Sequence, residues 1–254
     1  MNILRIGLLF LTALACRSFA LAEDAPEKLP ADGWWVRYFV TMRREGTNDD
    51  EIMKRTYSLV GTSMENGEKC RWVEMKTLYT INGTERTEID KFLIPETELL
   101  ESEKPLNSLV RAWQKRDDGP IKELNFNQPL GGRGFGGSAD YYFGQWMIVF
   151  PGPQRKAKVV REKRVVEWQQ GRLELGEARA GKRVASRQAV TVVQKQTIQM
   201  DFTVWNHPSA SPGFVAARTR MQVLIDDVPN RALAEEWTIE DFGTDAKSAL
   251  LENY

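Results

Sequence analysis

The sequence predicts a mainly β (α+β) protein: a curved antiparallel sheet or half-barrel of about ten strands, with two helices on its concave face. Segments that alternate apolar and polar residues with a period of two recur in both halves of the 254-residue chain. Tight turns such as Asn82-Gly83 separate these segments, as expected of hairpins. About ten strands exceed what a flat open sheet usually accommodates, so the sheet is expected to curl.

The N-terminus has the pattern of a cleavable secretory signal. Arg5 supplies a positive charge, residues 6–15 are apolar, and Ala20-Leu21-Ala22 offers a small-residue cleavage site. The apolar run is about half the length needed to cross a bilayer. We therefore expect a signal peptide over residues 1–22 and a single exported domain over 23–254, in the periplasm or secreted.

A lipoprotein signal is an alternative interpretation of the same region. Ala13-Leu14-Ala15-Cys16 would place a lipid on Cys16, although Leu is the usual residue where Ala13 stands. No later stretch is apolar for long enough to cross a membrane. We expect a water-soluble body without a transmembrane span.

Charge and cysteine content exclude several classes of protein. Once Arg5 and Arg17 leave with the signal, 33 basic and 35 acidic side chains remain, which gives no electrostatic footprint for nucleic acid. Cys70 is then the only cysteine, so no intramolecular disulfide can form. We interpret Cys70 as a small buried apolar residue rather than a reactive thiol.

The first half of the chain predicts an antiparallel meander of four strands. Alternation begins at Trp34, where Val36, Tyr38, Val40 and Met42 share one face. Turns follow at 46–50, 65–67 and 82–83, with a strand between each pair and another over 84–94.

Two segments favour helices. After a short helical run at 96–103, residues 105–116 place Leu106, Leu109, Val110 and Trp113 at helical spacing, and Gly119-Pro120 ends the run. Residues 139–150 are apolar nearly all round, and Pro151-Gly152-Pro153 is expected to end this second helix. Packing on the sheet explains such a segment better than a mobile lid does.

Strands return in the second half. They are predicted over 159–168, 172–177, 189–205, 215–225 and 233–242, and alternation is clearest where Ile198, Met200, Phe202 and Val204 share a face. The tail from Thr244 to Tyr254 is expected to fray at its end.

No metal, cofactor or catalytic site is predicted. His207 is the only histidine, which argues against histidine zinc sites and serine–histidine catalysis. Residues 132–137 match G-x-G-x-x-G, but no strong strand precedes them, so a flexible loop is the better interpretation. The acidic pairs near Asp50 and Asp117 fit solvated turns.

Eight tryptophans suggest either a wide filled core or a ring-lined cavity. A curved sheet under helices can enclose an apolar ligand. The candidate cavity residues are Trp72, Trp113, Trp146, Phe150, Met200, Phe202 and Trp237.

The chain also shows two resemblances to known groups of proteins. The stretches 67–72, 91–95 through Leu106, 202–205 through Phe214, and 243–250 resemble a group of exported proteins of planctomycete bacteria. That group has no assigned activity, so no residue role carries over. The order of strands and helices is also similar to the LolA and LolB type of periplasmic lipoprotein carrier, which implies a half-barrel with an apolar cavity; no motif is shared.

Three functions follow as hypotheses. The first is a noncatalytic envelope binding protein that encloses an apolar or lipid-like ligand. The second is a structural or protein-interaction module with a filled aromatic core, whose partner is an envelope protein. The third is an envelope hydrolase that uses carboxylates, for which no pair stands out among 35 acidic residues.

Overall fold

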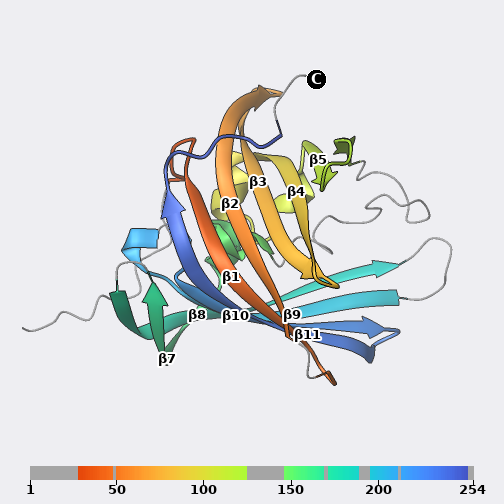
Figure 1. Cartoon of the computed structure of the whole chain (residues 1–254), viewed down its shortest axis with the longest axis vertical. Helices are drawn as coiled ribbons and strands as arrows, with labels where there is room; N and C mark the ends of the chain where they lie inside the picture. The colour runs from red at the N-terminus through yellow and green to blue at the C-terminus, as the bar shows by residue number, and fades with distance from the viewer. Residues whose placement is uncertain are drawn as a thin grey trace, which may run out of the picture.

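One curved, unclosed antiparallel sheet forms the protein, which confirms the predicted mainly β half-barrel (Figure 1). The computed structural model describes residues 28–47, 50–124, 146–168, 171–188, 195–210 and 213–250. The signal segment, Cys16 and the 132–137 loop lie outside these ranges. Within them the sheet has eleven strands, ordered β6-β5-β4-β3-β2-β1-β11-β10-β9-β8-β7. The strands are β1 (Trp35–Arg44), β2 (Asp50–Glu65), β3 (Glu68–Ile81), β4 (Thr84–Pro95), β5 (Arg111–Arg116), β6 (Lys122–Glu123), β7 (Lys158–Trp168), β8 (Gly171–Gln188), β9 (Lys195–Trp205), β10 (Ala216–Ile225) and β11 (Val228–Gly243).

The centre of the sheet is a seam between the first and last strands. β1 pairs with β2 on one side and with β11 on the other, with Val40 opposite Trp237. A bulge between Arg37 and Tyr38 shifts this register near the start of β1. Two consecutive meanders, β1 to β6 and β7 to β11, are thereby joined into one sheet.

Alternation along the strands places one apolar face toward the interior. Val36, Tyr38 and Val40 of β1 are fully buried in the main core, and Arg37 and Phe39 between them face outward. Short helical segments cover part of this concave face, because Leu99 and Ile148 belong to the same core cluster. The main apolar core therefore lies between the concave face and the helices.

The prediction of a helix over residues 105–116 is wrong. Pro105–Ser108 forms only a 3₁₀ turn, η1, after the confirmed short helix α1 (Glu96–Glu101). From Arg111 the chain is β5, which pairs with residues 88–93 of β4. The open edge of β4 supplies backbone hydrogen bonds to this segment, and this pairing overrides a helix-like spacing of apolar residues.

The helix predicted over 139–150 is also incorrect where the structure describes it, from residue 146. Trp146–Val149 is a 3₁₀ turn, η2, and Pro151 opens the short helix α3 (Pro151–Gln154) rather than ending one. Proline suits the first helical turn because its missing N–H has no partner there anyway. Gly152 allows α3 to pack tightly on α1, since a Cβ at this position would meet the Ser102 carbonyl.

The predicted hairpin turns are confirmed at Asn66-Gly67 and Asn82-Gly83. All four residues have positive φ, as such turns require. A third short link, η3 (Pro208–Ala210), connects β9 to β10. In the described part of the chain, no helix combines the length and apolar character needed to span a bilayer.

The C-terminal tail is docked on the sheet as far as residue 250, and its end, where fraying is expected, lies outside the described residues. Residues 244–250 run back across the outer face of the first meander, where the dark blue segment crosses the sheet in Figure 1. The Ala246 N–H donates to the Gly33 carbonyl at 2.8 Å, and Leu250 is buried. Sequence patterns could not indicate this docking, because the tail has no periodic alternation.

Candidate functional site

The seven candidate cavity residues do not form one group. Phe150, Met200, Phe202 and Trp237 belong to the main core on the concave side. Trp72 instead lies on the outer face with Cys70 and Leu93, and Trp113 packs against this second cluster. The side chain of Trp146 lies outside the described residues.

Aromatic rings fill the middle of the concave face. The rings of Tyr38 and Phe214 stack with centroids 4.5 Å apart, and Trp237 packs edge-on against both. The Tyr38 hydroxyl accepts a hydrogen bond from the Phe214 N–H at 3.2 Å. Tyr57 adds a fourth ring, whose centroid is 6.3 Å from that of Tyr38. This region is packed core, with each ring held in place by its neighbours.

A buried ionic cluster borders these rings. The Arg55 guanidinium lies 4.8 Å from the centroid of the Trp237 ring, and Arg55 Nη1 is 3.9 Å from Glu235 Oε1. Glu235 Oε2 accepts hydrogen bonds from the Thr219 hydroxyl and the Trp237 indole N–H, both at 3.1 Å. Arg55 and Glu235 are only 3% and 6% exposed. Charges so deeply buried are costly unless paired and hydrogen-bonded, which makes this cluster the most unusual feature of the concave face.

A second buried polar group lies toward the β4–β5 edge. The Gln114 side chain donates to Asp90 at 2.8 Å and to Glu88 at 2.9 Å. Burial, reinforced by the negative charge of Glu88, raises the pKa of Asp90 to about 7. Asp90 is therefore about half protonated near neutral pH.

Beyond the ionic cluster the concave face carries an apolar, methionine-rich row, which is flanked by Arg44 opposite Leu233 and by Arg183 opposite Met200. Leu233, Met221 and Met200 are cross-strand neighbours on β11, β10 and β9, so they share one face. Met42 is opposite Glu235 and joins the methionine row to the ionic cluster. Leu233, Met221 and Met42 are half-buried. We call Met42, Met200, Met221 and Leu233 the methionine row.

The outer face carries a second aromatic cluster under the C-terminal tail. Trp72 and Trp113 stack with centroids 4.7 Å apart, and the Lys91 ammonium lies 5.0 Å from the centroid of the Trp72 ring. Lys91 Nζ donates to the Leu250 carbonyl at 3.2 Å. The carboxylate of Glu74 accepts hydrogen bonds from the Ser248 hydroxyl and the Ala249 N–H. Trp72 and Trp113 therefore pack against Lys91, which binds the tail, on the face opposite the methionine row.

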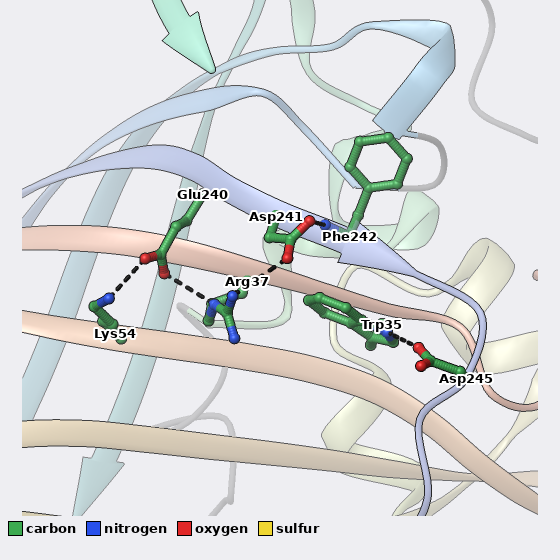
Figure 2. Close-up of polar contacts among 7 residues, drawn as sticks. All are labelled: Trp35, Arg37, Lys54, Glu240, Asp241, Phe242 and Asp245. Atoms are coloured by element: carbon green, nitrogen blue, oxygen red, sulfur yellow. Dashed lines mark hydrogen bonds and ion pairs between the residues drawn. The ribbon is translucent and has the colours of Figure 1, made fainter. Parts of the chain in front are cut away.

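Figure 2 shows the charged outer face at the seam. Arg37 pairs with Glu240 at 2.9 Å and with Asp241 at 3.3 Å, and Lys54 reaches Glu240 at 2.6 Å. The Trp35 indole N–H donates to Asp245 at the start of the tail. These partly exposed pairs link β1, β2 and β11, and each contributes little to stability alone.

Cys70 and His207, which belong to the residue types that most often react or bind metals, both pack against other parts of the structure. Cys70 is free and buried, as expected, and burial raises the pKa of its thiol. The ring of His207 packs edge-on against Trp168. In the part of the chain that the structure describes, no group of three or more His, Cys, Asp or Glu side chains is placed to hold a metal ion.

Arg55, Glu235 and Asp90 were not predicted as site residues, although a sequence signal was available for the first two. Arg55 stands between Met53 and Tyr57 in the inward register of β2, and Glu235 stands between Leu233 and Trp237 in that of β11. A charge in an apolar alternating face points to a buried polar group.

Comparison of the chain with known proteins gave no match to a protein-family model, to a curated protein or to a solved structure.

Proposed function

We propose that this protein is a noncatalytic binding protein of the cell envelope, which holds an apolar or lipid-like ligand against the concave face of its half-barrel. One observation carries the proposal: three members of the methionine row, Met42, Met221 and Leu233, are half-buried apolar side chains on the concave side of an unclosed sheet. Methionine is flexible and polarisable, so such a surface can adapt to an apolar ligand. Location in the envelope rests on the signal-like N-terminus.

The site is expected at the methionine row and not at the filled aromatic centre. The rings of Tyr38, Phe214 and Trp237 are fully buried against one another, so a ligand there would have to displace packed core. Half-buried Met221 and Leu233, in contrast, can be covered by a ligand at little cost.

The experiment compares two single substitutions on β10. Met221→Glu places a charge in the proposed site, whereas Gln222→Glu places the same charge on the opposite face of the same strand. An apolar fluorescent probe should bind the full chain and the Gln222→Glu variant equally, and bind Met221→Glu at least about tenfold more weakly. Native mass spectrometry of the purified chain should show a copurifying lipid.

A protein-interaction module is the second candidate. The observation that favours it is the close ring packing on the concave face, which is typical of a filled core. If the full chain bound no probe and carried no lipid, this second function would replace the first.

Asp90 and Glu88 give the hydrolase hypothesis a named pair, because they share the Gln114 amide and Asp90 has a raised pKa. Asp90 is only 1% exposed, however, so a substrate could not reach it without rearrangement. We rank this function last. Hydrolysis of an ester or glycoside by the full chain that Asp90→Asn abolished would restore it.

A further inference from the structure

Two buried charges on the outer face of β3 and β4 hold the C-terminal tail, the dark blue segment that crosses the sheet in Figure 1. Glu74 and Lys91 stand directly opposite each other on these strands. Their chain neighbours Val73 and Phe92 belong to the main core, so both charges lie on the other face of the sheet. Glu74 is only 4% exposed and Lys91 only 1%. We call this pair the tail site.

The tail site binds mainly the backbone of the tail. The Glu74 carboxylate accepts hydrogen bonds from the N–H groups of Ala249 and Leu250, at 3.1 and 3.4 Å. It also accepts one from the Ser248 hydroxyl at 2.9 Å, and Lys91 Nζ donates to the carbonyl of residue 250 at 3.2 Å. The side chain of Leu250 is buried, whereas Ala249 is exposed. The site therefore selects a hydroxyl residue, then any residue with an N–H, then a large apolar residue.

Such contacts are the kind that bind a peptide from another molecule. Main-chain hydrogen bonds supply affinity in peptide recognition, and a buried side chain supplies specificity. The tail can leave the site while the sheet stays intact, because β11 ends at Gly243 and residues 244–250 form no helix or strand. A short irregular segment with few buried side chains opens locally at low cost. Glu74 and Lys91 then regain water, which offsets part of the lost contacts.

We propose that the tail site binds an extended segment of a partner protein, in which Ser or Thr is followed by a residue other than proline and then by a large apolar residue. The chain's own tail is a built-in competitor for this partner. The site lies on the face opposite the methionine row, so the inference goes beyond the proposed function and does not depend on an apolar ligand.

A partner fits the tail site better than a second copy of this chain does. The tail of a second copy would make the same contacts as the chain's own tail, which is tethered at an effective concentration on the order of millimolar. A partner segment gains affinity by adding a contact, and Trp113 offers one. This half-buried ring has its centroid 6.0 Å from the Lys91 ammonium.

The test uses the full chain with Ala249→Pro, which removes an N–H that Glu74 binds and restricts the residue before it. This change should release the tail, and faster protease cleavage after Lys247 would report the release. The probe is a fluorescein-labelled, C-terminally amidated peptide of residues 246–250, measured by fluorescence polarisation. It should bind the Ala249→Pro chain at least about tenfold more tightly than the unaltered chain, whose site is filled by its own tail.

Two controls test whether the peptide binds at the tail site. The same peptide carrying Ala249→Pro should bind at least about tenfold more weakly. Adding Glu74→Gln to the Ala249→Pro chain should weaken binding of the original peptide by a similar factor. Glu68→Gln, a matched change at an exposed position of β3, should leave binding unchanged.

Three results would overturn the proposal. The first is unchanged cleavage after Lys247 in the Ala249→Pro chain, which would show that the contacts with Glu74 do not hold the tail. The second is failure of the original peptide to bind the chain with the released tail, or equal binding of the two peptides. The third is a dimer of the unaltered chain in sedimentation experiments that Ala249→Pro abolished, since the occupant would then be a second copy. Binding of the apolar probe to the methionine row is measured separately, so either idea can fail alone.

Discussion

Replacement of Glu235 by alanine should strongly destabilise the folded chain. The substitution leaves the Arg55 guanidinium, 3% exposed, without the carboxylate 3.9 Å away. It also removes the acceptor of the Thr219 hydroxyl and of the Trp237 indole N–H. Removing one partner of a buried ion pair costs roughly 3–5 kcal/mol, because the remaining charge stays out of water. We expect a loss of this size in the free energy of unfolding.

A double substitution separates the charge from the packing. Arg55→Met with Glu235→Gln removes both charges and retains a carbonyl oxygen for Thr219 and Trp237. Since no unpaired charge remains, the double variant should lose at least about 1.5 kcal/mol less than Glu235→Ala.

Urea unfolding followed by tryptophan fluorescence measures both effects. Glu236→Ala is the control, because Glu236 neighbours Glu235 but faces outward and pairs with Arg164 in a solvent-exposed position. It should change the free energy of unfolding by less than about 1 kcal/mol. If Glu235→Ala cost no more than Glu236→Ala, the buried pair would have no energetic importance and the reasoning would be refuted.

Three further predictions concern pH and the tail. Folding raises the pKa of Asp90 from 3.8 to about 7, so the protonated Asp90 stabilises the folded state at low pH. This contribution, on the order of a few kcal/mol, is complete below about pH 4 and is lost as the pH rises to 7. Asp90→Asn should flatten this decline in the free energy of unfolding measured between pH 4 and 8. Glu74→Ala should speed amide hydrogen exchange at Ala249, because the Glu74 carboxylate accepts a hydrogen bond from the Ala249 N–H. Unchanged exchange would contradict the assigned contact. Gly33→Ala should release the tail, since Gly33 has a φ of +93° and an added Cβ would lie 2.5 Å from the Thr244 carbonyl oxygen. Faster protease cleavage after Lys247 would show that the tail has been released. Gly46→Ala is the control, because Gly46 lies at a turn with open space around it.

The sheet could be predicted because local patterns determined it. Period-two alternation and Asn-Gly turns fix strands and hairpins within about twenty residues, and the structure contains them. The pairing of β1 with β11 could not be predicted, because it joins residues about 200 positions apart and leaves no local signal.

The two helix predictions failed for a related reason. Residues 105–116 have a helical spacing of apolar side chains, but Leu106 packs in the main core while Trp113 packs on the outer face. The spacing of apolar residues within one segment does not show that these residues pack into two separate apolar clusters. The same limit applies to the candidate cavity residues, since the tryptophan pattern did not distinguish the face beneath the tail from the concave face.

The seam between β1 and β11 has a consequence for how the chain reaches its native state. The first meander can form early, but one long edge of β1 stays open until the last strand has been synthesised. Contacts so distant in sequence form slowly, and an open strand edge invites aggregation in the meantime. A chain of this topology therefore exposes an aggregation-prone strand edge for longer than a chain whose neighbouring strands are all close in sequence.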